Sequence, residues 1–469
     1  MQYTYFPIKQ MHQDTPYRRA WYGVVLLLGL LLISACSVAS KPDSPATAPN
    51  PDAGSASNPV IPLPQTTPSP IGMAPAAIES PIETYPTPKP APTIDSELLF
   101  LRGGSLLAYG MTTGQEREIA PDVQEFGATR DGQWIAMVRG DGLSAEVWVV
   151  ARDGSELRQV TNNQRTESSL SWAPDGSALT YASTDNAMRY PLLPDWLNWA
   201  AWCSASDVRL LDIASGDEQL FERGCAPAFS TDGRRIAFVT PPTSNEPATS
   251  ANPTPTENNT IRLINRQGQN GWSFAIARGA TSPTGRLVYA AAWSPDGAWI
   301  AYHRFIGYQA LTDVNLTEMG HSLEGGNVLL NAGAGWLLPP RFDPDGQYMA
   351  VVEHDFSDAR GWGGYEHWQV SVLNLKQTGE VILPDGTRPA EAALQARLPR
   401  VTAAAWSPNG NEMIIALPQG WQPGASENEP LFVEQTAGSL WRWLPGQPIQ
   451  EQLLTNVDFA SPLLWLPAV

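Results

Sequence analysis

The stretch Ala291-Ala-Trp-Ser-Pro-Asp-Gly-Ala-Trp-Ile-Ala-Tyr-His303 decides the fold, because the same phrase recurs along the chain. In each copy a tight turn joins two apolar segments. Pro presets φ, Asp or Asn caps its own backbone, and Gly takes the positive φ that such turns require. The turn glycines are Gly132, Gly176, Gly233, Gly297, Gly346 and Gly410, so successive copies lie 44 to 64 residues apart. A β-rich repeat of roughly 40–50 residues is typical of β-propeller blades, with the surplus in insertions.

The two ends of the repeat region complement each other. Ser461-Pro-Leu-Leu-Trp-Leu-Pro467 repeats the first strand of a unit and stops where the turn is due, whereas residues 97–101, 105–109 and 116–119 resemble second, third and fourth strands. Together they would complete one blade and leave no open edge on the ring. We therefore expect an all-β, seven-bladed β-propeller over residues 94–469, with its last blade closed by both termini; six blades is the alternative.

The N-terminal segment predicts export and lipid attachment. Lys9, Arg18 and Arg19 precede an apolar run over residues 21–35, which is short for a membrane span and fits the core of a signal peptide. Ile33-Ser-Ala-Cys36 resembles the bacterial lipobox, whose cysteine is acylated. We expect residues 1–35 to be a lipoprotein signal peptide and Cys36 to be the lipidation site that anchors the chain to the membrane. An uncleaved signal anchor with a buried cysteine is the alternative.

Composition separates the next segment from the rest. Residues 36–93 are rich in Pro, Ser, Ala and Thr and nearly lack aromatic residues, which predicts a disordered tether. The whole chain has 18 Trp and only 16% charged residues, enough apolar material for a sizeable core. Its formal net charge of -18 repels phosphate backbones, so a nucleic-acid partner is not expected.

Propeller geometry sorts the predicted loops onto two faces. The tight Asp-Gly turns would crowd one face, here called the turn face. The long insertions over residues 184–206, 241–259, 305–326, 354–368 and 418–438, with the connection 383–399, would emerge on the other, the loop-rich face. Because loops carry function more often than the scaffold does, we expect any site on the loop-rich face.

Two cysteines support this map. Cys203 ends one insertion and Cys225 lies in the connection that leaves the same blade. Outside the cytosol such a pair usually forms a disulfide, which we expect here. Two buried free thiols or a metal-binding pair are the alternatives.

Aromatic residues gather in two of the insertions. Trp196, Trp199 and Trp202 recur at three-residue spacing, and Trp362, Tyr365 and Trp368 lie among glycines. Exposed Trp and Tyr anchor protein interfaces and stack on sugars, so we predict that these six residues bind a ligand. The alternative is that they form the small core that a long insertion needs.

Histidines and carboxylates suggest a rival chemistry. His303, His321, His354 and His367 lie at strand ends or loops of adjacent blades, with Glu353 and Asp355 nearby. Such a group could bind a divalent metal or transfer protons, but no His-x-x-x-His spacing is present, and we predict neither a metal nor a cofactor. The carboxylates of Asp343-Pro-Asp-Gly346 resemble calcium ligands, yet they match the repeated turn and are interpreted as turn residues.

The repeated Trp/Phe-Ser-Pro-Asp-Gly phrase resembles the blades of the TolB-like, WD-repeat-like propeller family across residues 94–469. The resemblance implies a scaffold or binding role in the cell envelope. Similar blades gate prolyl-oligopeptidase-like enzymes, whose Gly-x-Ser-x-Gly motif does not occur here. We expect a monomeric, non-enzymatic, extracytoplasmic lipoprotein that binds a protein, peptide or glycan through its loop-rich face. The alternative is an extracellular hydrolase or lyase acting on saccharide or peptide at that face.

Overall fold

The computed structural model of the chain describes residues 95–188, 196–241, 259–276, 287–305, 312–318, 327–332, 338–354, 368–376, 394–423, 437–449, 451–459 and 461–469. Thr87–Val469 forms one compact unit. The signal peptide, Cys36 and the tether predicted over residues 1–93 lie outside the described residues. So do Trp362, Tyr365, His321 and His367.

The strands in the described part of the chain form seven four-stranded antiparallel sheets, numbered here along the chain and given from the inner to the outer strand. Sheet 1 contains β28 (Leu464–Leu466), β1 (Glu97–Arg102), β2 (Ser105–Gly110) and β3 (Glu116–Ala120). Sheet 2 contains β4 (Val123–Ala128), β5 (Trp134–Arg139), β6 (Glu146–Ala151) and β7 (Arg158–Gln159). Sheet 3 contains β8 (Thr166–Trp172), β9 (Ala178–Thr184), β10 (Ser206–Asp212) and β11 (Glu218–Arg223). Sheet 4 contains β12 (Cys225–Phe229), β13 (Arg235–Val239), β14 (Thr260–Asn265) and β15 (Trp272–Ile276).

Sheet 5 contains β16 (Leu287–Trp293), β17 (Trp299–Phe305), β18 (Thr312–Glu318) and β19 (Asn327–Ala332). Sheet 6 contains β20 (Arg341–Phe342), β21 (Tyr348–His354), β22 (Trp368–Asn374) and β23 (Leu394–Pro399). Sheet 7 contains β24 (Ala403–Trp406), β25 (Met413–Pro418), β26 (Ala437–Trp443) and β27 (Glu451–Asp458). The helical elements among the described residues are η1 (Gly142–Ser144) and α2 (Trp196–Ala205). The strands of the repeated units therefore lie where the sequence predicts them.

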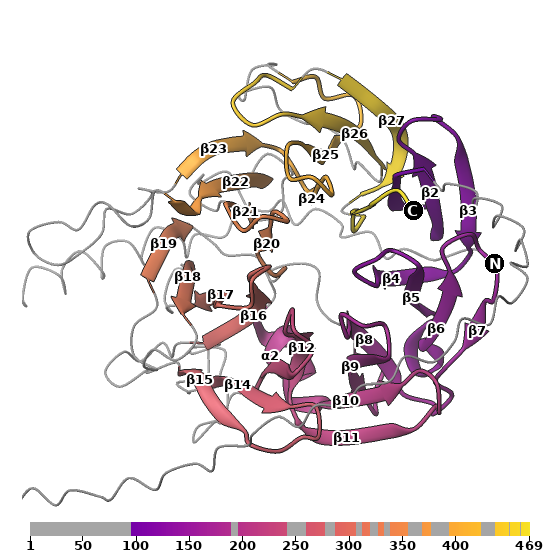
Figure 1. The fold of residues 1–469 in the computed structure, drawn as a ribbon, viewed down its shortest axis with the longest axis vertical. Coiled ribbons are helices and arrows are strands. Elements are labelled where there is room, and N and C mark those ends of the chain that lie inside the picture. The colour runs from indigo at the N-terminus through magenta and orange to yellow at the C-terminus, as the bar shows by residue number, and fades with distance from the viewer. Residues whose placement is uncertain are drawn as a thin grey trace, which may run out of the picture. The chain divides into compact units, whose positions relative to one another are not determined.

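The sheets surround a common centre, and the fold is a β-propeller (Figure 1). Each sheet shares a buried apolar cluster with the next one along the chain, for example Leu99 with Phe126 between sheets 1 and 2 and Val147 with Trp172 between sheets 2 and 3. The last such cluster joins sheet 7 to sheet 1, where Leu440 packs with Leu98. The core is thus a circle of interfaces between sheets, and closing it buries the apolar faces of the first and last sheets.

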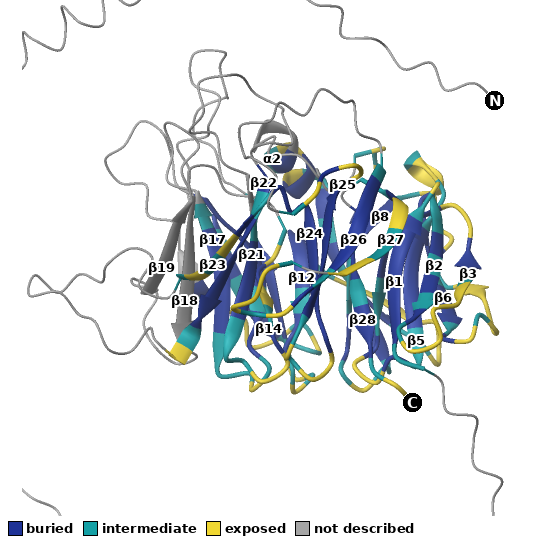
Figure 2. Ribbon diagram, turned by 90° about the horizontal axis from the view of Figure 1, so that it is seen from above, coloured by how far each residue is buried: buried dark blue, intermediate teal, exposed yellow. Residues whose placement is uncertain are grey.

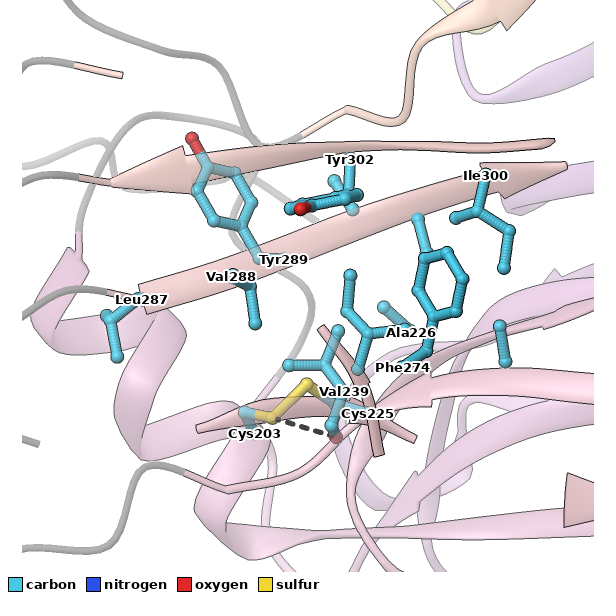
Figure 3. Packing of buried hydrophobic residues seen from close by; sticks show 14 of the residues in the cluster. Cys203, Cys225, Ala226, Val239, Phe274, Leu287, Val288, Tyr289, Ile300 and Tyr302 are labelled. Carbon is cyan, nitrogen blue, oxygen red and sulfur yellow. Dashed lines mark hydrogen bonds between the residues drawn. A yellow bond between two sulfur atoms is a disulfide. The ribbon is translucent and has the colours of Figure 1, made fainter. Parts of the chain in front are cut away.

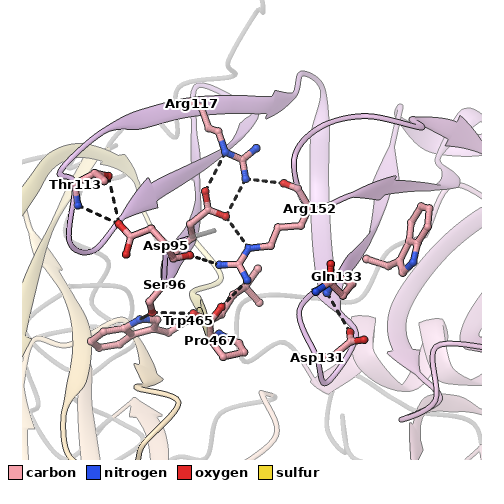
Figure 4. Close-up of polar contacts among 12 residues, drawn as sticks. Asp95, Ser96, Thr113, Arg117, Asp131, Gln133, Arg152, Trp465 and Pro467 are labelled. Atoms are coloured by element: carbon pink, nitrogen blue, oxygen red, sulfur yellow. Dashed lines mark hydrogen bonds and ion pairs between the residues drawn. The ribbon is translucent and has the colours of Figure 1, made fainter. Parts of the chain in front are cut away.

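Both ends of the domain meet in sheet 1. β28 pairs antiparallel with β1, as the complementary ends of the sequence predict. Arg152, which follows β6 and is 1% exposed, secures this junction (Figure 4). Its Nε donates to Glu97 Oε2 at 2.8 Å, and its other nitrogens donate to the carbonyls of Asp95 and Pro467. One buried side chain therefore holds both chain ends against sheet 2.

The repeated turns have the chemistry that their residues predict. In the copy that begins at Ser294, the Ser294 hydroxyl donates to Asp296 Oδ1, and that oxygen accepts the backbone N–H of Ala298 at 2.9 Å. Gly297 has φ +69°. Asp343 occupies the serine position in its own copy, because its Oδ1 accepts the Tyr348 N–H at 2.7 Å, as Ser294 Oγ accepts the Trp299 N–H. The turn interpretation of Asp343 is confirmed.

The tryptophans of the repeat link neighbouring sheets. Trp172, Trp293 and Trp406 each donate an indole N–H to a backbone carbonyl of the preceding sheet, at 3.3, 3.1 and 3.1 Å. The accepting residues are Gly127, Ala228 and Arg341, and each lies five residues before the turn glycine of its own copy. The repeated phrase thus encodes a contact between sheets as well as a turn.

Candidate functional site

A disulfide fixes the first insertion to the ring. Cys203, in α2, is bonded to Cys225, the first residue of β12, and both are fully buried (Figure 3). The pairing predicted from the sequence is therefore present. Figure 2 shows α2 at the edge of the ring opposite the exposed turns. The bond joins the insertion of sheet 3 to the inner strand of sheet 4 on the loop-rich face.

The tryptophans of this insertion are core residues. Trp199 and Trp202 have no exposed surface and belong to the apolar cluster that joins sheets 4 and 5, where the Trp199 ring lies 5.8 Å from the Tyr289 ring. A buried ring offers no face to a ligand, so the predicted stacking surface is wrong for these two residues. Of Trp196 the structure describes only the backbone, as the first residue of α2. The two rings therefore extend the core between sheets 4 and 5, and this packing holds α2 in place.

Trp368 is also buried. It begins β22, is 4% exposed and contacts Phe459 edge-on, with the ring centroids 6.1 Å apart. Its predicted role as an exposed ligand anchor is therefore wrong. Its proposed neighbours Trp362 and Tyr365 lie outside the described residues, so the second aromatic group stays a prediction.

His303 is the one member of the histidine group whose side chain the structure describes. It is 1% exposed, its ring stacks on Tyr289 at 5.3 Å, and its Nε2 lies 3.0 Å from the carbonyl oxygen of Leu338. Burial lowers the pKa of His303 to about 4, so the ring is neutral at neutral pH. The described residues contain no group of three His, Cys, Asp or Glu side chains placed to hold a metal ion.

Two buried carboxylates near the loop-rich ends of sheets 2 and 3 were not predicted. Glu146, at the start of β6, accepts the Thr161 hydroxyl at 2.6 Å and the backbone N–H groups of Asn163 and Gln164. Glu167, in the inner strand β8, is 1% exposed and accepts the Ser183 hydroxyl at 3.3 Å. Burial raises the pKa of Glu167 to about 7. The sequence contained one signal for Glu167: it is an acidic residue in an inner strand, at a position where the other repeats have mainly apolar or small residues.

Three inner strands have a β-bulge at the same position. Ser169, Ala226 and Ala290 lie at equivalent positions of β8, β12 and β16, each has a positive φ of 48° to 59°, and the pairing register shifts beside each one. Such bulges turn backbone donors out of the ladder. In β8 the freed N–H groups of Ser169 and Leu170 donate to Glu125 of sheet 2 at 2.8 and 2.7 Å. Backbone donors of this kind bind carboxylates, and here the protein supplies its own.

Two open grooves are lined by described residues. One, of about 500 Å³, runs along the turn face past Asp175, Asp232, Arg234 and Arg266. Arg266 pairs with Asp175 at 3.1 Å, and hydrogen bonds from Ser177 followed by those from Arg266 hold the pKa of Asp175 below its usual value. The other, of about 510 Å³, lies between β27 and sheet 1 beside Arg102. Concave surfaces are therefore not confined to the loop-rich face, where the sequence analysis expected any site.

Three solved structures are similar in fold. TolB from Acinetobacter baumannii is 14% identical with a TM-score of 0.40, and the match covers 77% of this chain and 79% of that protein. The fold is shared with TolB proteins and other β-propellers. Oligogalacturonate lyase from Vibrio parahaemolyticus is 14% identical with a TM-score of 0.46, covering 70% of this chain and 89% of that protein. The β-propeller domain of Swd1 from Myceliophteria thermophila is 11% identical with a TM-score of 0.44, covering 71% and 86%.

No protein-family model matches the sequence, and no curated protein does. Among the described residues, no helix is long and apolar enough to cross a membrane.

Proposed function

We propose that the chain is an extracytoplasmic lipoprotein, anchored through Cys36, whose propeller binds a protein, peptide or glycan partner on the loop-rich face without catalysis. The observation that carries the proposal is the rigid mounting of α2. The disulfide and the buried Trp199 and Trp202 fix this helix above the ring. A surface held in its binding conformation loses less conformational entropy when a partner binds.

The disulfide also supports the proposed location outside the cytosol. Such bonds persist in oxidising environments outside the cytosol, in agreement with the signal peptide and lipobox predicted before Cys36. Lipidation is testable by itself. In cells, the Cys36→Ser variant should lose incorporation of a labelled fatty acid and leave the membrane fraction. Equal labelling of the variant and the wild type would exclude Cys36 as the acylated residue.

The binding proposal is tested with two matched substitutions, one at each end of sheet 3. Ala201 is exposed on α2, and Ala214 is exposed in the turn after β10 at the opposite end of the same sheet. We would measure binding of the purified chain to defined glycan and peptide arrays. Ala201→Arg should weaken the binding of whichever probe the wild type retains, because a large charged side chain covers α2, whereas Ala214→Arg should not. Weakening by Ala214→Arg alone would place the site on the turn face.

The alternative, a hydrolase or lyase at the same face, is distinguished by turnover. If it holds, saccharide or peptide substrates are cleaved by the wild type and not by the His354→Ala, His367→Ala double variant. If the binding proposal holds, the double variant keeps the affinity for the probe and neither protein cleaves it. Cleavage that requires the two histidines would replace the proposal.

A further inference from the structure

An arginine stands where the repeat otherwise has small residues. Five residues before the turn glycine, the inner strands of sheets 2, 3, 4, 5 and 7 carry Gly127, Ser171, Ala228, Ala292 and Ala405. Sheet 6 carries Arg341 at this position. The other repeats fold with a small residue at this position, so the fold itself does not require an arginine here. Such a departure from a regular repeat is expected at functional positions.

The Arg341 side chain extends along the inner side of the ring. Its backbone is fixed, because the carbonyl oxygen of Arg341 accepts the Trp406 indole at 3.1 Å. Its Nη1 donates to the carbonyl oxygen of Leu463 at 2.8 Å. Leu463 directly precedes β28 of sheet 1, and sheet 7 lies between sheets 6 and 1 in the ring (Figure 1). The guanidinium therefore passes the inner edge of sheet 7, which is built here of alanines 403 to 405.

The guanidinium is accessible and carries an unbalanced charge. Arg341 is exposed to solvent, and so are Pro339, just before the same strand, and Gln124, in the inner strand of sheet 2, so water reaches the centre of the ring. Among the described residues it has no carboxylate within ion-pair distance.

Three other arginines that approach the core each pair with a carboxylate. Arg152 pairs with Glu97 at 2.8 Å, Arg165 with Asp207 at 2.9 Å and Arg209 with Glu218 at 2.9 Å. The chain has 47 acidic residues against 29 Lys and Arg, so acidic partners are abundant. A guanidinium has five N–H donors, and the Arg341 side chain makes one hydrogen bond to the described residues, the bond to Leu463. The remaining donors are free to bind an anion.

We propose that Arg341 binds a carboxylate group of a ligand that enters the centre of the ring. The planar guanidinium matches a carboxylate with two parallel hydrogen bonds. A dianionic phosphate would be repelled more strongly than a carboxylate by a chain of net charge -18. This site is separate from α2, so it does not depend on the function proposed for the loop-rich face.

The test is chemical protection of the wild-type chain. Phenylglyoxal modifies accessible arginines, and mass spectrometry reports the rate at each one. N-acetylglycine, a monocarboxylate, should slow the modification of Arg341 about threefold at about twice its dissociation constant. It should leave exposed Arg130, on the turn face, unchanged. The neutral analogue N-acetylglycinamide, at equal ionic strength, should protect neither residue.

A variant pair separates binding from a structural role. N-acetylglycine should raise the melting temperature of the wild type and of Arg130→Met, but not that of Arg341→Met. If Arg341→Met only lowers the melting temperature of the ligand-free chain, and no carboxylate protects Arg341 from phenylglyoxal, the side chain merely holds Leu463 and the proposal is wrong. Protection by methyl phosphate with none by N-acetylglycine would also overturn it.

Discussion

Glu167 makes the stability of the ring depend on pH. Burial raises its pKa to about 7 in the folded chain, against 4.5 for the ordinary side chain. The folded state therefore binds more protons between these values, and its contribution to stability is present below pH 4.5 and lost as the pH rises to about 7. We expect Glu167→Gln to be more stable than the wild type at pH 8, by at most about 3 kcal/mol, and to show no gain at pH 4.5.

Urea denaturation at the two pH values measures this difference. Glu118→Gln, at an exposed position of β3, is the control for removing one negative charge. If Glu118→Gln reproduces the gain at pH 8, the effect comes from the net charge of -18 and not from the burial of Glu167.

Arg152 and Arg117 both pair with the Glu97 carboxylate, but they differ in solvent exposure. Arg152 is 1% exposed and pairs with Glu97 at 2.8 Å, whereas the Arg117 side chain is 32% exposed and pairs at 2.9 Å. Removing Arg152 leaves the carbonyl groups of Asp95 and Pro467 without this donor, and leaves Glu97 paired only with the more exposed Arg117. We expect Arg152→Met to lower the free energy of unfolding by about 3 kcal/mol, and Arg117→Met by about 1 kcal/mol or less. Equal losses in urea denaturation would contradict the assigned role of Arg152.

The residue chemistry of the turns was readable from the sequence because it is local. Asp-Gly turns and the serine or aspartate that caps them need only neighbours two to five residues away, so even Asp343 was interpreted correctly. Glu167 and Arg341 were missed because burial and charge balance depend on residues brought together from different sheets. Comparing each repeat at the position of Arg341 would have found that residue, since its equivalents are all small.

At the scale of elements, the strands were predictable and α2 was not. Each strand follows from its place in the repeat, and each repeat supports the others. The insertion between β9 and β10 of sheet 3 occurs once, so it had no second copy for comparison. Its tryptophans at 196, 199 and 202 have the three-residue spacing of one helix face, but the sequence predicted only a long insertion there. The helix buries Trp199 and Trp202 in the core.

The disulfide should stabilise the insertion and the ring together. Cys203 and Cys225 are 22 residues apart and enclose β10 and β11 of sheet 3. Closing a loop of this length restricts the unfolded chain and contributes about 3 kcal/mol. We expect the Cys203→Ala, Cys225→Ala double variant to unfold at lower urea concentration, and added reductant to have no further effect on it. A reductant effect of equal size on the wild type and the double variant would show that the bond is not the cause.

For the whole molecule, the arrangement of the chain ends follows from incomplete units at both termini. A single strand near residue 465 and three strands near residue 100 cannot each form a stable sheet, but pairing β28 with β1 completes one. The face that binds a partner could not be derived in the same way. Its insertions differ from unit to unit, and aromatic content alone did not distinguish a binding surface from the core of an insertion.

Hydrogen–deuterium exchange of the intact chain, with and without the tightest-binding probe from the arrays, tests most directly whether the loop-rich face binds the partner. If the loop-rich face binds the partner, the probe slows amide exchange in α2, residues Trp196–Ala205, and leaves exchange in the turn between β14 and β15 unchanged. Slower exchange confined to that turn and its neighbours on the turn face, with none in α2, would contradict it.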